Sequence, residues 1–526
     1  MYKINQMVLP IGFDENEITQ LLAEKIKVDV SRLFNVILRK LSIDARDKNN
    51  LCYKASIVFD VHGEFNYKKF KNVNIYNEES YNVQKWNGGD KNIVIVGSGP
   101  SGLFAGLSLV ESGAKVTILE RGYEMQRRQQ VVNNLMSNGQ LDENSNIQFG
   151  EGGAGTFSDG KLNTGIKSYY VKKVLETFYK FGANKNILYD SRPHIGTDIL
   201  SSVIVNMREY IINHGGQVLF EHKYVGQNFN ECNEIESVDV LTPDGLKVLP
   251  CDILVLAIGH SSRDTINMLF DNNMEIKQKA FAMGFRIEHL QSEINKSQYG
   301  TSIEAQLLPP ADYHIVEHLD NGRVVYSFCM CPGGVVVPAM SAYGQVVTNG
   351  MSYNSRDGVN SNSALLVGVN TSDFPSTHPL SGIDLQEKLE RHAYNKTGSY
   401  KAIVQRVGDF LNSKPTIKLG KVKPSYMPGV VLGSVEDLLP EFIVESIKTA
   451  IPRIANRVKG FDDKDAILTG VETRSSAPYQ IIRDVNMMSS LKGVYVIGEG
   501  AGFAGGIVSS AVEGLKCANI ICSQNG

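Results

Sequence analysis

Residues 91–122 read KNIVIVGSGPSGLFAGLSLVESGAKVTILERG and carry the strongest indication of the fold. An apolar strand runs into a glycine turn, a helix follows, and a second strand ends at an acidic residue, which together predict a βαβ unit. In its GxGxxG pattern, Gly97 permits a tight turn, Gly99 lets the backbone approach a pyrophosphate, and Gly102 lets the helix pack closely on the strand. A dinucleotide-binding domain is therefore expected here.

The start of this predicted helix presents unpaired N–H groups and the positive end of the helix dipole, which suits two phosphates. Glu120 ends the second strand, where its carboxylate can accept hydrogen bonds from ribose hydroxyls and would repel a 2′-phosphate. The pattern fits NAD or FAD. The residues expected to contact the nucleotide are Gly97, Ser98, Gly99, Pro100, Ser101, Gly102, Glu120 and Arg121.

Two later segments favour FAD. The apolar strand that ends in AIGH, residues 257–260, is typical of the return of the chain to the nucleotide in two-domain flavoproteins, and it makes Gly259 a candidate contact. In VYVIGEGAGFAGGI, residues 494–507, an acid after the strand can hold the ribityl chain and the glycines let the backbone crowd the flavin. A helix beginning there would direct its N-terminus at the flavin N1–C2=O edge and stabilise the reduced form. The candidate contacts in this segment are Gly498, Glu499, Gly505, Gly506 and Ile507.

A glycine-rich loop occupies residues 150–165. We expect it to lie along the pyrophosphate and the flavin, where its N–H groups would form an anion-binding nest. A flexible surface loop is the alternative. The candidate contacts in the loop are Gly152, Gly153, Gly155 and Lys161, the last of which could bring positive charge to the flavin or remain solvated.

The length of 526 residues predicts three to four domains at about 150 residues each. The expected class is α/β, with a discontinuous Rossmann-like FAD-binding domain, an inserted β-rich substrate domain and an N-terminal α+β domain. The last has a β-α-β-β order that suits a ferredoxin-like unit. The expected boundaries are 1–88 for the N-terminal domain, 91–278 and 462–526 for the two parts of the FAD-binding domain, and 279–461 for the substrate or cap domain.

The composition of the chain excludes several classes of protein. Hydrophobic residues make up 42% and charged residues 21%, which is ordinary for a globular chain and excludes disorder throughout. The net charge of -3 gives no overall attraction to nucleic acid or a membrane surface. The N-terminus lacks a signal-peptide pattern, no apolar run approaches the roughly 18 residues that span a bilayer, and the seven scattered cysteines fit a reducing compartment. We therefore expect a cytoplasmic location and no metal site.

Three long stretches together resemble the family of FAD-dependent or NAD(FAD)-utilising dehydrogenases: NIQFGEGGAGTFSDGKLNT at 146–164, CMCPGG with the segment up to residue 357, and GVETRSSAPYQIIRD with the glycine-rich tail up to 514. The resemblance implies a two-domain flavoprotein with a discontinuous FAD domain and an N-terminal α+β appendage. It implies no particular substrate. Glu499 stands where flavoproteins usually have aspartate.

Three residues are candidates for catalysis. Strand alternation in VVYSFCMC places Ser327, Cys329 and Cys331 on one face, and the following Pro-Gly-Gly turn would expose Cys331 as a nucleophile or redox partner facing the flavin. Two small buried residues are the alternative. Arg286 could hold a substrate carboxylate or pair with a protein acid, and His289 could be an acid–base group or a structural histidine. Further polar residues could line a pocket or be ordinary turn residues: Asn349, Ser352, Arg356, Asn362 and Arg474.

These features predict an FAD-dependent oxidoreductase that passes a hydride between flavin N5 and a small organic substrate. No second GxGxxG lies in a βαβ unit, so electrons would come from the substrate, from transient NAD(P)H or from a protein donor. One alternative is a monooxygenase of the aromatic hydroxylase type. Another is a flavin-loaded redox-sensing protein whose residues 1–88 bind RNA or a protein.

Overall fold

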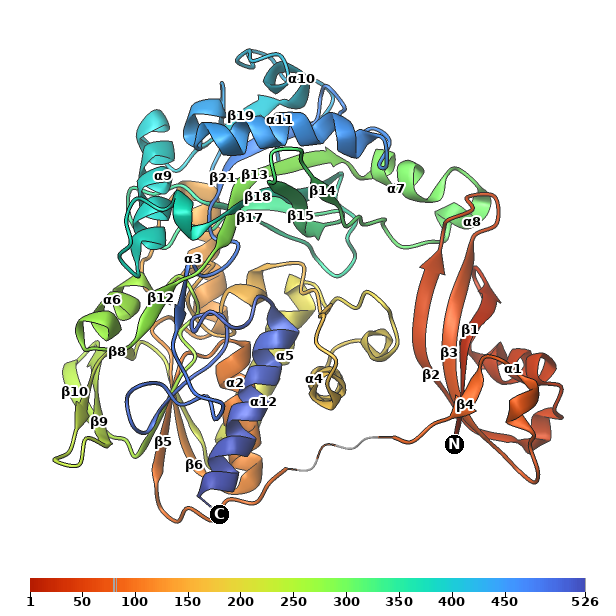
Figure 1. Cartoon of the computed structure of the whole chain (residues 1–526), viewed down its shortest axis with the longest axis horizontal. Helices are drawn as coiled ribbons and strands as arrows, with labels where there is room; N and C mark the ends of the chain where they lie inside the picture. Colours follow the sequence, from red (N-terminus) through yellow and green to blue (C-terminus); the bar gives the residue numbers. More distant parts are fainter. Residues whose placement is uncertain (79–80, 82, 526) are drawn as a thin grey trace.

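The computed structural model describes residues 1–78, 81 and 83–525, which form three regions (Figure 1). The first, which we call the N-terminal domain, is an antiparallel sheet of order β2-β3-β1-β4 with one α-helix against it. A 3₁₀ helix at Tyr67–Lys69 stands where a complete ferredoxin-like unit has its second helix. Its elements are β1 (Tyr2–Pro10), α1 (Ile18–Ile26), β2 (Leu33–Asp44), β3 (Cys52–Val61) and β4 (Val73–Ile75).

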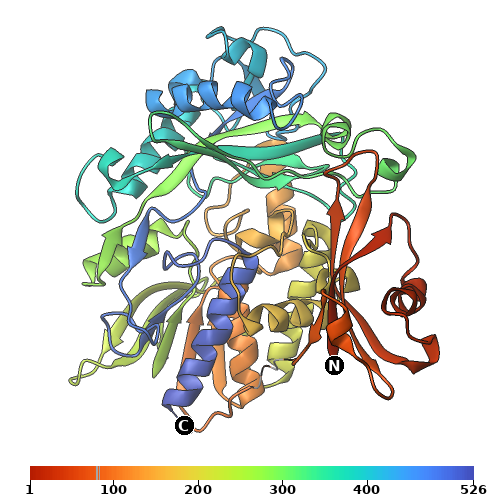
Figure 2. The same cartoon turned by 45° about the vertical axis from the view of Figure 1, so that its right-hand side comes forward.

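The N-terminal domain is held against the rest of the chain by strand β2 (Figure 2). The Leu41 amide donates to the Tyr189 carbonyl at 2.6 Å, and the Ser191 amide donates to the Leu41 carbonyl at 2.8 Å. At the tip of the β2–β3 hairpin, Lys48 Nζ donates to the Ser297 carbonyl at 2.6 Å. The domain therefore contacts both of the other regions.

The second region, the α/β domain, contains a five-stranded sheet of order β23-β11-β5-β6-β7 in which every neighbouring pair is parallel. Parallel sheets are covered on both faces, which explains the continuous apolar runs of these strands. The strands are β5 (Asn92–Val96), β6 (Lys115–Leu119), β7 (Gln217–Leu219), β11 (Ile253–Leu256) and β23 (Val494–Val496).

Successive side chains of β5 point to opposite faces of this sheet. Ile93 and Ile95 belong to the core under the helices, whereas Val94 and Val96 belong to the core under an antiparallel sheet. The covering helices are α2 (Pro100–Ser112), α4 (Tyr169–Lys180), α5 (Thr197–Asn213) and α12 (Ile507–Gln524), and the covering strands are β8 (Lys223–Phe229), β9 (Ile235–Thr242) and β10 (Gly245–Pro250).

Helix α2 has ends that its sequence explains. It begins with Pro100 at its first turn and stops at Gly113, which has a left-handed φ of 95°. Glycines let two neighbours come close: a Cβ on Gly106 would lie 2.7 Å from Ile118 Cδ1, and a Cβ on Gly514 of α12 would lie 2.2 Å from the Ser101 carbonyl oxygen. Helices α2 and α12 therefore lie side by side on the sheet (Figure 1).

The third region, the cap domain, contains a seven-stranded sheet of order β14-β15-β18-β13-β21-β19-β20. Helix α11 (Glu441–Ala455) packs on one face of it, and α9 (Ser381–Thr397) lies at its side (Figure 1). The strands are β13 (Phe281–Leu290), β14 (Val316–His318), β15 (Val324–Cys331), β18 (Asn360–Val369), β19 (Ala402–Arg406), β20 (Val430–Leu432) and β21 (Ile467–Glu472).

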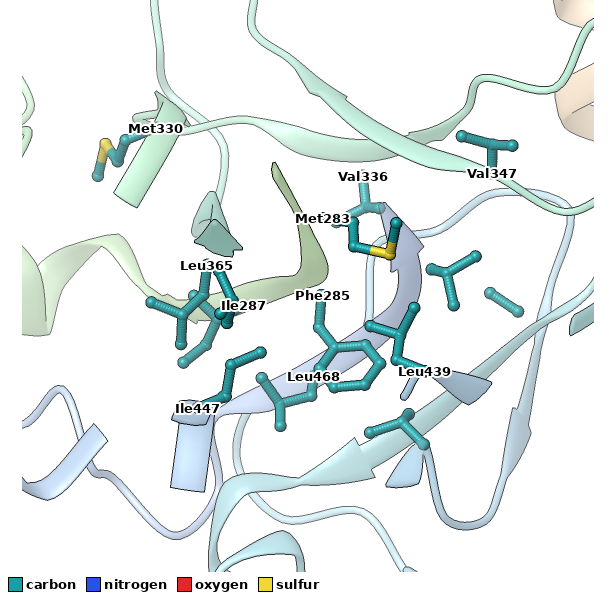
Figure 3. Close-up of a cluster of buried hydrophobic side chains, with 14 of the residues drawn as sticks. Met283, Phe285, Ile287, Met330, Val336, Val347, Leu365, Leu439, Ile447 and Leu468 are labelled. Atoms are coloured by element: carbon teal, nitrogen blue, oxygen red, sulfur yellow. The ribbon is translucent and has the colours of Figure 1, made fainter. Parts of the chain in front are cut away.

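Alternation in β13 divides the cap sheet into an apolar and a polar face. Met283, Phe285 and Ile287 lie in the core with Ile447 of α11 (Figure 3). Arg286 stands between them in sequence and therefore points to the opposite face. That face is directed at the α/β domain.

The chain crosses twice between the two larger domains, where β12 (Ile276–Gln278) pairs with β22 (Tyr479–Ile481). Because β21 pairs with β13 and β19 in the cap sheet, the second part of the α/β domain starts after Glu472, later than the expected boundary at 462. The sequence shows an apolar strand at β21 but not the sheet that it joins.

The remaining elements are short connections and cover helices: α3 (Met125–Asn138), α6 (Arg263–Asp271), α7 (Gln291–Tyr299), α8 (Ile303–Gln306), α10 (Val407–Phe410), β16 (Val335–Pro338) and β17 (Thr348–Met351). Among the described residues, every helix is too short or too polar to cross a lipid bilayer.

Candidate functional site

A cavity lies between the α/β domain and the polar face of the cap sheet. The carboxyl ends of β5, β6 and β11 open into it, which is where ligands bind in parallel α/β sheets. The N-termini of two helices also border the cavity, α2 through Gly99 to Ser101 and α12 through Gly505 to Ile507. Both present unpaired N–H groups and a positive dipole end.

The turn at the start of α2 has room for backbone only. Gly97 has a φ of 103°, and a Cβ there would lie 2.4 Å from the Ala257 carbonyl oxygen. A Cβ on Gly102 would lie 1.9 Å from the Gly97 carbonyl oxygen, and one on Gly153 would lie 3.0 Å from Gly99 Cα. Real Cβ contacts are essentially never shorter than 3.0 Å, so the first two glycines are required by packing.

Glu120 joins three backbone segments around this turn. One carboxylate oxygen accepts from the Ser98 amide at 3.0 Å and the Ser98 hydroxyl at 2.7 Å. The other accepts from the amides of Gly122 at 2.9 Å and Gly150 at 3.0 Å. Glu120 borders the cavity, so it is placed to meet a ribose, and that contact stays a prediction.

Loop 150–165 runs along the cavity toward the cap. Gly153 lies beside Gly99 at the start of α2, and a Cβ on Gly155 would lie 3.0 Å from Ile507 Cγ1 at the start of α12. Farther on, Lys161 Nζ donates to Asp159 at 2.9 Å and to the Met330 carbonyl in the cap. The loop therefore connects the two helix N-termini to the cap sheet.

Asp159 is the buried anchor of this connection, because Arg356 binds it through two hydrogen bonds of 2.9 and 2.5 Å in addition to Lys161. Burial disfavours the charged carboxylate, but Lys161 and Arg356 outweigh it and hold the pKa of Asp159 below its usual value.

We expect Asp159→Asn to destabilise the protein by about 3 kcal/mol at neutral pH, because it leaves two cations without their buried partner. The loss, measured by urea unfolding, should shrink as the pH falls below the usual carboxyl range, where the depressed pKa no longer contributes stability to the wild type. The exposed Asp357→Asn is the matched control and should cost less than about 0.5 kcal/mol. Equal effects of the two variants would contradict the role of Asp159.

The cap side of the cavity corrects the prediction for the two cysteines. The register of β15 against β18 shifts between Phe328 and Cys331, and Cys329 adopts a left-handed φ of 43°. Cys329 lines the cavity, whereas Cys331 is fully buried and burial raises its pKa. The prediction of an exposed Cys331 is wrong. The Pro-Gly-Gly turn leaves its thiol buried, and the β-bulge interrupts the strand alternation that placed Cys329 and Cys331 on one face.

Arg286 is fully buried beneath this bulge. Its guanidinium binds Glu472 at 3.1 and 3.0 Å, Asn362 Oδ1 at 2.8 Å and the Cys329 carbonyl at 2.5 Å. These bonds engage each of its nitrogens. Arg286 therefore pairs with a protein acid and is not available to a substrate carboxylate.

His289 lies outside the cavity lining. Its ring is buried, its Nε2 is 2.9 Å from the Phe461 carbonyl, and burial lowers its pKa. The geometry thus matches the structural histidine, and the acid–base role loses its support.

Most of the predicted cofactor contacts border the cavity: Gly97, Gly99, Pro100, Ser101, Glu120, Arg121, Gly153, Gly155, Lys161, Gly259, Glu499, Gly505, Gly506 and Ile507. The remaining predicted contacts do not line the cavity but pack against residues that do, or against one another. The Ser98 amide binds Glu120, the Gly152 amide donates to the Ser98 carbonyl at 3.0 Å, and a Cβ on Gly498 would lie 2.2 Å from Ser101 Oγ. Gly102 acts through its contact with Gly97.

Of the polar residues predicted to line a pocket, some line the cavity and the others bind protein groups. Asn349 and Arg474 line the cavity. Arg356 binds Asp159, Asn362 binds Arg286, and Ser352 donates to the Pro332 carbonyl at 2.9 Å.

Several lining residues were missed by the sequence reasoning. His260, directly after the AIG turn, lies with Nδ1 3.4 Å from Glu499, and its buried Nε2 has no hydrogen-bond partner among the described residues. Its position after a predicted ligand-binding strand could have suggested it. Glu472 and Phe149 reach the cavity only through the packing of the two domains. Phe149 contacts the Arg121 guanidinium at 4.5 Å from its ring centre.

The arrangement fits a dinucleotide that carries a second ring system. It offers a glycine cradle that a Cβ would fill, two helix N-termini and the unpartnered Nε2 of His260 inside one cavity. Fold and site together are those of a nucleotide-binding protein.

Comparison with known proteins identifies the nucleotide. Residues 280–475 match the family described as FAD-dependent protein, C-terminal domain-like, and residues 1–59 match a domain of unknown function, DUF8436. An uncharacterized protein of Clostridium beijerinckii is 43% identical over 533 residues, covering 99% of this chain and 98% of the relative. The chain belongs to the family of this clostridial protein, and it is an FAD-dependent protein.

Solved structures show only a distant likeness. A flavoprotein/dehydrogenase of Cytophaga hutchinsonii is 10% identical, with 82% of this chain and 78% of that chain covered and a TM-score of 0.36. A halogenase, PltM, in complex with FAD is 11% identical, with 83% and 70% covered and a TM-score of 0.39. These likenesses carry no functional argument.

Proposed function

We propose that this protein is an FAD-dependent oxidoreductase of the dehydrogenase or reductase type, which transfers a hydride between flavin N5 and a small organic substrate. One observation supports it above all: the cavity that would hold FAD is also lined by polar residues of a separate cap domain, among them Cys329, Asn349 and Glu472. A substrate enclosed between that surface and the cofactor would be shielded from water.

Different residues along the cavity would bind different parts of FAD. Glu120 and the start of α2 would hold the ribose and the pyrophosphate, and the start of α12 would place its positive dipole end near the flavin ring. Bound FAD supplies a two-electron acceptor at this end. Lys161, held by Asp159, adds a fixed positive charge beside the cap. A fixed positive charge and a helix N-terminus both favour an anionic reduced cofactor.

The electron donor is proposed to be the substrate itself, transient NAD(P)H or a protein. The test is anaerobic reduction of the purified, FAD-loaded protein against a panel of metabolites that includes NADH and NADPH, followed by flavin absorbance. We expect at least one small organic compound or nicotinamide to bleach the flavin.

Two outcomes would contradict the proposal. A purified protein that shows no flavin absorbance even after FAD is added would refute the cofactor site. NADPH consumption coupled to oxygen uptake only with a phenolic compound would instead indicate a monooxygenase of the aromatic hydroxylase type. The Gly102→Ala variant is the control that should carry much less FAD than the wild type.

A further inference from the structure

We propose that Cys329 is a catalytic thiolate of this site, which accepts the proton that the substrate releases on oxidation. The proposal rests on the proposed function and deepens it, because it specifies a substrate that carries an O–H or N–H next to the reacting carbon. In that step the C–H electron pair leaves as a hydride to the oxidised FAD, the O–H or N–H proton passes to Cys329 Sγ, and a C=O or C=N bond forms. The substrate loses two electrons, and FAD takes them up.

The position of Cys329 follows from the order of contacts along the cavity. Glu120 marks the ribose end, Gly153 lies beside the start of α2, and Gly155 lies beside Ile507 at the start of α12. Loop 150–165 then reaches the cap at Met330, the neighbour of Cys329. Cys329 is therefore at the end of the cavity opposite the ribose site, where the flavin ring and the substrate would meet.

The two acids nearby are each paired with a buried arginine, although burial raises the pKa of Glu472 to about 7. Both oxygens of Glu472 accept from Arg286, and both oxygens of Asp159 accept from Arg356, with Lys161 as a further partner of Asp159. A proton taken up by either carboxylate would break a buried ion pair. Cys329 lines the same cavity, and its proton uptake would break neither of these carboxylate pairs.

The surroundings stabilise a negative sulfur. The pKa of the Cys329 thiol is held below its usual value, first by the hydrogen bond from Cys331 and then by the positive charges of Arg286 and Lys161, which outweigh burial. The titratable and charged groups that face Cys329 from the surrounding elements are Cys331 on β15, Arg286 on β13, Glu472 on β21 and Lys161 and Asp159 on loop 150–165.

The backbone at Cys329 is also held in an unusual conformation. A left-handed φ of 43° is uncommon for a residue with a Cβ, and such conformations persist where the surrounding structure enforces them. Here the Arg286 guanidinium binds the Cys329 carbonyl at 2.5 Å. The bulge turns this one thiol to the cavity while its neighbour two residues later stays buried.

The first test measures the thiol in the FAD-loaded protein. Alkylation by iodoacetamide, followed residue by residue with mass spectrometry across pH, should label Cys329 with a midpoint well below that of exposed Cys232. A long-wavelength absorbance band from the thiolate beside the oxidised flavin should appear with the same midpoint. Both signals should vanish in Cys329→Ser and persist in Cys232→Ser. Lys161→Met should raise the midpoint by about one pH unit.

An alkylation midpoint at Cys329 equal to that of Cys232, or a band that persists in Cys329→Ser, would overturn the proposal. The second test uses whichever alcohol or amine reduces the flavin in the panel. Cys329→Ser should keep its FAD and slow that reduction by about 100-fold or more, with loss of the pH dependence that the thiolate gives the wild type. An unchanged rate would refute the base role. Reduction by NAD(P)H alone would also refute it, while leaving the oxidoreductase proposal intact.

Discussion

Replacing Gly102 by alanine is expected to yield a folded protein that has lost most of its FAD. The added Cβ would lie 1.9 Å from the Gly97 carbonyl oxygen and 3.1 Å from its carbon, so either the turn or the start of α2 must move. Such overpacking costs about 1–3 kcal/mol. The strain falls on the segment that places N–H groups against the pyrophosphate, and we expect FAD affinity to drop by about tenfold or more.

The measurement is the ratio of flavin to protein absorbance after purification, together with the thermal shift on adding FAD. Gly165→Ala is the matched control, because a Cβ there meets no atom within 4 Å and the residue lies in the neighbouring glycine-rich loop. It should bind FAD like the wild type. Full FAD occupancy in Gly102→Ala would show that the cofactor does not depend on this turn.

Replacing Glu390 by glutamine is expected to have the largest effect on stability. Glu390 of α9 is fully buried and receives two hydrogen bonds of 2.8 Å from Arg263 of α6 and bonds of 3.0 and 2.7 Å from Arg474. Burial disfavours its charge, but the two guanidinium groups outweigh that effect and hold its pKa well below the usual range. The cluster joins the cap to the α/β domain beside the cavity.

Glu390→Gln would leave two buried guanidinium groups without their shared anion, and losses of about 3–5 kcal/mol are typical for such a broken pair. Urea unfolding of the FAD-loaded protein measures the change. Glu387→Gln is the control, since Glu387 is 29% exposed and lies 3.7 Å from Arg263, and it should cost about 1 kcal/mol or less. If both variants cost the same, the buried cluster does not hold the domains together.

The catalytic candidates show why part of the site could not be predicted. Regular alternation in VVYSFCMC placed both cysteines on one face, but a bulge separates them and leaves only Cys329 on the cavity. Arg286 was recognised as a residue that could bind a carboxylate, and the carboxylate is Glu472, 186 positions later in the chain. His289 had the right chemistry for acid–base catalysis and the wrong surroundings.

The glycine turns and the order of strands and helices in the α/β domain could be predicted from the sequence, because a glycine turn, a helix start and an apolar strand are local patterns whose backbone geometry follows from the residues within them. Glycines 97, 102 and 498 could be placed in this way. Which side chains meet across the α/β and cap domains depends instead on long-range packing. The partners of Arg286, Asp159 and Glu390 lie far apart in sequence, and packing rather than local preference brings them to one cavity.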